Sequence, residues 1–142
     1  MRADIGLAFH YDLHSAHQHG SYEKYSMKIP QIGAPVRGSS TGRPVMVLLD
    51  LLGRRMTLRV LWELRGGPLT FRALQDAAET NPAVLNTRLH ELRGAGLVAH
   101  DGGGYRLTED GAALLDLLLP LVDWSEGWSR RLETVLTPAG RE

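Results

Sequence analysis

Three side chains with the chemistry to read a DNA base edge occur within one short stretch of the sequence. Asn86, Thr87 and His90 carry an amide, a hydroxyl and an imidazole, and on a helical wheel of about 100° per residue they share one side. Short donors and acceptors of this kind pair with base edges on the floor of the major groove. Ala83 lies on the same side, where its small size allows close approach. We therefore expect a recognition helix here.

The stretch from Asn81 to Val98 carries the local signals of a helix that ends on glycines and continues into a strand. Asn81 suits the capping position, since its side chain accepts a hydrogen bond from a free backbone N–H. Pro82 suits the first helical position, where its missing N–H is not needed. The apolar residues share the side opposite the polar groups: Val84, Leu85, Leu89 and Leu92.

Four arginines surround this helix in the sequence. Arg93 lies at the edge of the polar side and suits a phosphate, whereas the wheel places Arg88 nearer the buried side. The head of Arg88 is expected to meet an acid such as Asp76 or to reach the DNA backbone. Arg54 and Arg55 start an earlier helical stretch, where positive charge opposes the helix dipole. They are either phosphate ligands or solvated loop residues.

The elements before the recognition helix complete a helix-turn-helix. Thr70 is expected to cap a short helix that a tight turn joins to Asn81. Two short helices so joined, the second with a polar outer side, are typical of DNA-binding motifs. In the preceding helical stretch, the wheel predicts one broad apolar stripe: Leu58, Leu61, Trp62 and Leu64.

A small β-hairpin is expected behind the helix. LVAH and YRL alternate as strands, and DGGG between them tolerates positive φ. Such a wing reaches toward phosphates, yet its tip holds only Asp101 and glycines. Phosphate contacts would then come from His100, Arg106 or backbone N–H groups. A hairpin that only covers the core is the open alternative.

Two apolar helices flank this motif. The first, Arg43 to Leu52, is apolar nearly all round, and the last begins at its cap Thr108 and contains Pro120, which should kink or break it. Together they hold more apolar surface than a small domain covers, which indicates a dimer contact; a last helix folded back on its own core is the alternative. The expected interface residues are Val45, Leu48, Leu49, Leu52, Leu118, Leu121, Val122, Trp124 and Trp128.

Composition excludes several classes of function. The 142 residues contain no cysteine, which removes disulfides, thiolate catalysis and cysteine zinc sites. No apolar run reaches the roughly 20 residues of a membrane span, and no secretory signal is recognisable, so a cytoplasmic protein is expected. Residues 41–107 carry a net charge of +3 and residues 108–142 a net charge of −4, which suits a nucleic-acid module joined to a partner-binding helix. No glycine-rich phosphate loop or HExxH motif indicates an enzyme.

The expected domain organisation has three parts. Residues 1–42 read as a flexible arm, residues 43–136 as a single domain, and residues 137–142 as a tail. His10, His14 and His17 would share a face if the arm were helical and could bind a transition metal. No carboxylate completes that set, so we expect neither a metal nor a cofactor. Translation from Met1 or from Met27 is left open.

The motifs together resemble the HxlR-type winged-helix transcription regulators of bacteria, relatives of the MarR group. The resemblance spans Arg43 to Trp128 and rests on the order and spacing of LLGRR, TLRVLWEL, PLTFRAL, NPAVLNTRLHEL, GLV and YRLTEDG. It implies a mainly α fold with a small β-hairpin wing (α+β). It also implies a homodimer, held by its terminal helices, that places two recognition helices on a palindromic operator in double-stranded DNA.

The chain departs from the family pattern in its short, uncharged wing, in Met56 where tryptophan is common, and in having no cysteine for a thiol switch. The wing, with Glu91 beside the presumed DNA face, leaves open a protein-interaction module without DNA binding. A metal-responsive regulator using the histidine arm is a further alternative, and a small-molecule effector is possible. The expected DNA-binding residues are Arg54, Arg55, Thr70, Asn81, Ala83, Asn86, Thr87, Arg88, His90, Arg93, His100 and Arg106.

Overall fold

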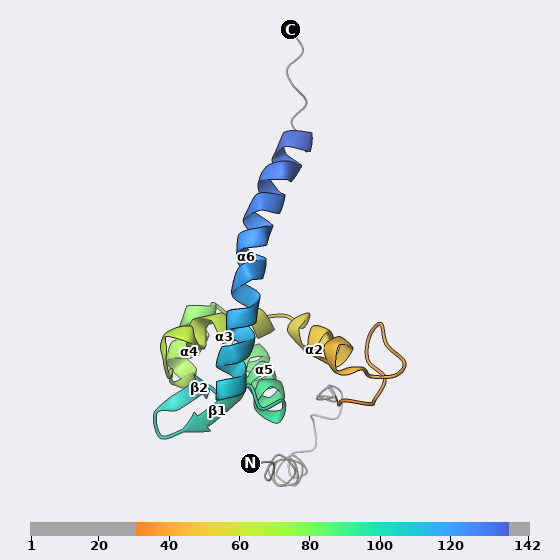
Figure 1. The fold of residues 1–142 in the computed structure, drawn as a ribbon. Helices are drawn as coiled ribbons and strands as arrows, with labels where there is room; N and C mark the ends of the chain where they lie inside the picture. The colour runs from red at the N-terminus through yellow and green to blue at the C-terminus, as the bar shows by residue number, and fades with distance from the viewer. Residues whose placement is uncertain (1–30, 137–142) are drawn as a thin grey trace.

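The computed structural model describes residues 31–136, so the histidine-rich stretch lies outside the described residues. Figure 1 shows a helical body with a two-stranded antiparallel hairpin at its lower edge, which confirms the expected fold class. Within residues 31–136, no helix is long and apolar enough to cross a membrane. The elements are α2 (Pro44–Leu52), α3 (Thr57–Glu63), the 3₁₀ turn η3 (Leu64–Gly66), α4 (Phe71–Ala78), α5 (Pro82–Gly94), β1 (Val98–Asp101), β2 (Gly104–Leu107) and α6 (Glu109–Leu136).

Side-chain caps begin three of these helices, each where the sequence predicts one. Thr70 Oγ1 accepts a hydrogen bond from the Ala73 N–H at 3.2 Å, and Asn81 Oδ1 accepts one from the Val84 N–H at 2.9 Å. Thr108 Oγ1 accepts from the Gly111 N–H at 3.0 Å and donates to the Gly96 carbonyl at 2.6 Å. Because each cap satisfies a donor that the helix itself cannot, α4, α5 and α6 start at fixed residues.

Helix α3 lies at the centre of the core. Its buried residues follow the spacing i, i+3, i+4 and i+7. The expected apolar stripe is confirmed at Leu61 and Leu64 and wrong at Leu58, which is 48% exposed. Met56 adopts a left-handed conformation with φ of 71°, so the helix begins only at Thr57. The buried residues contributed by α3 and η3 are Thr57, Val60, Leu61 and Leu64.

The hairpin is anchored to the connector that precedes α4. Val98 pairs with Leu107 and Asp101 with Gly104 in antiparallel register, while Leu69 and Tyr105 exchange backbone hydrogen bonds of 2.9 and 2.8 Å. A Cβ on Gly104 would lie 2.4 Å from the Leu69 carbonyl oxygen. This close approach requires glycine and joins the wing to the helix-turn-helix.

Only the first turns of α6 pack on the body. Gly111 and Leu115 are buried there, and the rest of the helix projects away from the domain (Figure 1). The helix continues without interruption through Pro120, so the expected break is wrong. Pro120 and Asp116, whose carbonyl loses its helical donor, are both exposed, and water can satisfy that carbonyl.

Candidate nucleic-acid interface

Helix α5 separates its buried and polar residues as expected. Leu85, Leu89 and Leu92 are buried in the core, where they hold α5 against α3. On the other side Ala83 and Asn86 are exposed, while Thr87 and His90 are partly exposed. The helix therefore presents an amide, a hydroxyl and an imidazole outward from a rigid support, which is the arrangement that base recognition needs.

The hydrogen bonds of these polar side chains determine what each can still accept or donate. The Thr87 hydroxyl donates to the Ala83 carbonyl at 3.0 Å, so its oxygen remains available as an acceptor and its methyl group as an apolar contact. Within residues 31–136, neither Asn86 nor His90 makes a side-chain hydrogen bond. The Asn86 amide therefore keeps both a donor and an acceptor for a ligand.

Arg54 and Arg88 point inward and meet the same carboxylate. Arg54 Nη1 donates to Glu91 Oε1 at 2.6 Å and its Nη2 donates to Asp50 Oδ2 at 2.9 Å. Arg88 Nη1 donates to Glu91 Oε2 at 2.5 Å, not to Asp76, which lies 3.9 Å from Arg72. The expected position of Glu91 beside the DNA face is also wrong, since Glu91 is only 3% exposed. Its two oxygens are instead shared between two arginines.

The charge on Arg54 is maintained by these partners. Burial by itself lowers the pKa of a guanidinium, but the hydrogen bonds and charges of Asp50 and Glu91 outweigh it and raise the pKa of Arg54 above its ordinary value. A guanidinium does not lose its proton in proteins, and these contacts hold the Arg54 charge inside the cluster. A guanidinium so engaged is a poor candidate for a phosphate ligand.

The remaining two arginines near α5, Arg55 and Arg93, have no ion-pair partner among residues 31–136. Both are exposed. Arg55 lies in the connection between α2 and α3, and Arg93 in the last turn of α5. Of the four arginines singled out in the sequence, these two keep an available guanidinium.

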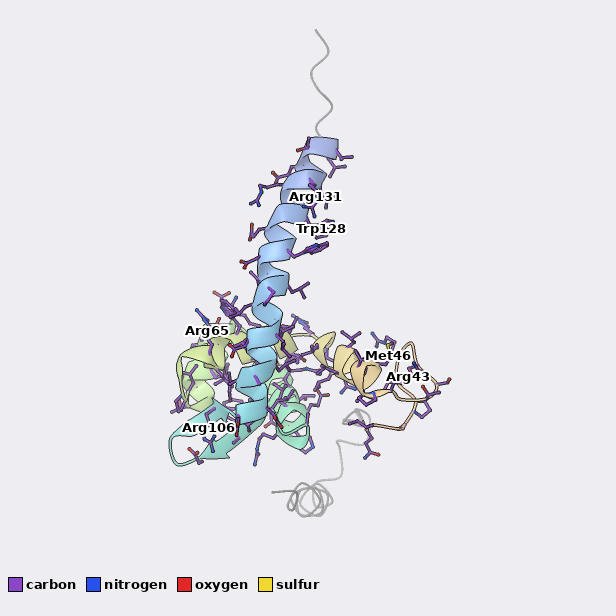
Figure 2. All side chains as sticks on the ribbon, viewed as in Figure 1. Arg43, Met46, Arg65, Arg106, Trp128 and Arg131 are labelled. Carbon is purple, nitrogen blue, oxygen red and sulfur yellow. The ribbon has the colours of Figure 1, made fainter. Side chains whose placement is uncertain are left out.

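The wing carries a charge pair that neutralises its one arginine. Arg106 Nε donates to Asp101 Oδ2 at 2.7 Å, and Figure 2 shows Arg106 on the hairpin below the helical body. This hydrogen bond, with one from the Gly103 N–H, lowers the pKa of Asp101 below its ordinary value, so the pair is ionised at neutral pH. The His100 ring stacks on Tyr105 with centroids 4.1 Å apart. The wing thus offers little free positive charge.

The structure divides the nine expected interface residues into two groups. Leu52 is buried in the core, and Leu48 and Leu118 pack against it. The other six are exposed: Val45, Leu49, Leu121, Val122, Trp124 and Trp128. On the projecting part of α6, labelled at Trp128 and Arg131 in Figure 2, the two tryptophan rings stack with centroids 5.9 Å apart.

Helix α6 also carries apolar residues that the sequence reasoning did not assign to an interface. Leu117 and Leu132 are exposed and continue the spacing of Leu121, Trp124 and Trp128. Steps of four, three, four and four residues keep all five on one side of a helix. We call these five residues the α6 stripe. Their period was readable from the sequence.

Comparisons with known proteins agree with this geometry. The family model described as HxlR-like helix-turn-helix matches residues 51–133. An uncharacterised helix-turn-helix transcriptional regulator of Methanocaldococcus jannaschii is 26% identical over 88 residues, which cover 58% of this chain and 83% of that protein. The quinone-bound crystal structure of YodB from B. subtilis superposes with a TM-score of 0.57 at 26% identity, covering 59% of this chain and 97% of that one.

Proposed function

Because the chain belongs to the HxlR-like helix-turn-helix family of transcription regulators, we propose that it binds a palindromic operator as a cytoplasmic homodimer. The observation that carries the proposal is the polar face of α5, held outward by three buried leucines. The symmetry of a homodimer would present two such faces to successive major grooves, with half-sites about 34 Å apart.

Base recognition is assigned to Asn86, Thr87 and His90. The free amide of Asn86 suits the N6 and N7 groups of adenine, which one asparagine can contact bidentately. The Thr87 hydroxyl already donates a hydrogen bond to the Ala83 carbonyl. Its oxygen would therefore accept a hydrogen bond from an exocyclic amine, or its methyl group would contact a thymine methyl group. His90 would reach a base or a phosphate, and Ala83 leaves room for the groove.

Phosphate contacts are assigned to the available arginines, Arg55 and Arg93. Arg54 and Arg88 have carboxylate partners inside the protein, and we assign them no DNA contact. Thr70 and Asn81 use their side chains as caps. They begin α4 and α5, and backbone N–H groups at helix starts are common phosphate ligands.

Replacing Arg55 tests the proposal directly. Genomic fragments selected by the full chain would define the operator, and fluorescence anisotropy would then measure affinity for it across a salt series. Arg55→Ala should weaken binding to operator and unrelated DNA alike, and the slope of log K against log salt should become shallower by about 0.9. The control, Arg130→Ala on the projecting part of α6, should leave both affinities unchanged.

If the intact dimer selects no fragment even at low salt, the proposed function is refuted. The alternative of a protein-interaction module would then gain weight, because the Asp101–Arg106 pair leaves the wing without free positive charge.

The same pair yields a prediction about the wing. Asp101→Asn keeps an oxygen for the Gly103 N–H but removes the charge that holds Arg106. We expect affinity for all DNA to rise, and the salt slope to steepen by up to about one phosphate contact. Arg106→Ala in the Asp101→Asn background should abolish the gain. An unchanged salt slope in Asp101→Asn would show that the wing does not reach the DNA backbone.

We assign the contact between the two subunits to the α6 stripe. Val122 and two exposed residues of α2, Val45 and Leu49, would extend it. An apolar row this long rarely stays in water on a soluble protein. A second copy would cover it by the same surface, since a two-fold dimer pairs identical patches. The projection of α6 from the body leaves that surface accessible (Figure 1).

A small-molecule effector is a further part of the proposal. The structure of YodB holds a quinone, which supports a quinone-like effector for this chain. The chain contains no cysteine, so such a ligand would bind without a thiol adduct. The metal-responsive alternative depends on His10, His14 and His17, which lie outside the described residues.

A further inference from the structure

One partly buried charge cluster joins the first described helix to the recognition helix. We call Asp50, Arg54, Arg88 and Glu91 the ion cluster. Asp50 belongs to α2, Arg54 to the following connection, and Arg88 and Glu91 to α5. Three hydrogen bonds of 2.9, 2.6 and 2.5 Å link them in the order Asp50–Arg54–Glu91–Arg88. The recognition helix is thus tied to α2 through Arg54, which bonds Glu91 on one side and Asp50 on the other.

Glu91 costs more to bury than an apolar residue at the same place. It is 3% exposed, and removing a carboxylate from water carries a penalty that well-placed partners only offset. A buried ion pair is therefore a weak source of stability compared with a leucine of similar volume. Its distinguishing property is directional: both oxygens must meet a donor in a defined geometry. Such directional bonds suit a cluster that fixes the orientation of α5.

Apart from this link, α2 is held by apolar contacts of its buried residues Val47, Leu51 and Leu52. Leu51 and Leu52 enter the core and Leu48 packs against it, while Val45 and Leu49 remain exposed. Figure 1 shows α2 extending to one side of the body formed by α3, α4 and α5. Apolar contacts permit small rotations that a hydrogen-bonded charge pair resists. The link from Asp50 to Glu91 is therefore well placed to set the angle between α2 and α5.

We propose that Glu91 is a positioning residue that holds α5 at a fixed orientation to α2 and thereby determines which half-site spacing the homodimer accepts. The inference rests on the proposed homodimer and palindromic operator. If α2 contributes to the subunit contact, the separation of the two α5 helices depends on how each is held to its own α2. Adding one base pair between the half-sites rotates one half-site relative to the other by about 34°. A rigid link between α2 and α5 would prevent the two recognition helices from adjusting to that rotation.

Glu91→Gln tests the proposal, because it preserves shape and removes the charge. Palindromes built from the selected half-site, with the central spacer shortened or lengthened by one base pair, are compared by anisotropy. The unaltered protein should prefer one spacing. In Glu91→Gln, the ratio of affinities for the preferred and the altered spacing should fall about tenfold, while the preference among half-site bases is kept. Thermal stability should fall whichever role Glu91 has, because Arg54 and Arg88 lose a charged partner. A merely structural role would reduce affinity for every duplex in parallel and leave the spacing preference intact.

Asp76→Asn provides the matched control, since it neutralises an exposed carboxylate whose nearest partner is 3.9 Å away. It should leave the spacing preference intact. Asp50→Asn serves as a second variant if Glu91→Gln does not fold. It removes only the α2 end of the cluster, and it should relax spacing in the same direction.

Two results would overturn the inference, and they are distinguishable. If the unaltered protein prefers one spacing and the folded variants retain that preference, Glu91 has no positioning role although the proposed function stands. If the unaltered protein selects no palindrome, the proposed function fails and the inference fails with it.

Discussion

Asn86→Ala is expected to lower affinity for the operator by about 1–3 kcal/mol, the discrimination that one good bidentate contact supplies. Affinity for unrelated DNA should stay unchanged, because Asn86 contributes no charge to phosphate binding. The side chain is exposed and makes no hydrogen bond within residues 31–136, so its removal should leave the fold intact. Anisotropy titrations with operator and scrambled duplexes of equal length measure both affinities.

Asn81→Ala is the matched control for this prediction. It removes the same amide from the same helix, but Asn81 caps α5 through the Val84 N–H. The loss of a cap costs about 0.5–2 kcal/mol of folding stability. Asn81→Ala should therefore lower the midpoint of thermal unfolding, whereas Asn86→Ala should leave it unchanged. If Asn86→Ala lowers the affinity for operator and scrambled DNA equally, Asn86 does not recognise a base.

Features that depend on neighbouring residues were predictable from the sequence. The caps at Thr70, Asn81 and Thr108 follow from short polar side chains placed before helical runs, and the structure confirms all three. The hairpin follows from alternating strands around glycines and is also confirmed. In each case the interaction spans a few residues, so local sequence contains both partners.

The ion cluster shows where such reasoning stops. Arg88 and Glu91 are three residues apart, and Asp50 and Arg54 four, so each of these pairs could be expected on a helix. The bond between Arg54 and Glu91 crosses 37 positions of sequence and depends on how the connection after α2 lies against α5. A wheel places Glu91 on a helix but cannot show what covers it. Arg54 consequently reads as a phosphate ligand until its carboxylate partners are known.

Packing likewise decided which residues of α3 are buried. The sequence offers several leucines at helical spacing, so more than one side of the helix is apolar. In the structure the buried side passes through Val60 and Leu61, and Leu58 faces outward. Helix geometry fixes the order of residues around the axis, but the elements packed on α3 decide which side faces the core.

The α6 stripe leads to a second large effect. Leu121 lies near the middle of the stripe and is 58% exposed in the single chain. If a partner subunit covers it, Leu121→Asp places an unpaired carboxylate in an apolar contact, which is strongly unfavourable. We expect the dimer to dissociate and operator affinity to fall by about 10²- to 10⁴-fold, because each recognition helix loses the effective concentration supplied by the other.

Light scattering would give the molar mass of Leu121→Asp, and anisotropy would give its affinity for a whole operator and for a single half-site. Binding to the half-site should persist, since α5 and its support in the core are unaltered. Thr134→Asp adds the same charge at an exposed position about 140° around α6 from Leu121 and should leave both mass and affinity unchanged. A fully dimeric Leu121→Asp protein would mean that the subunits meet elsewhere, and the stripe would then need a different partner to explain its exposure.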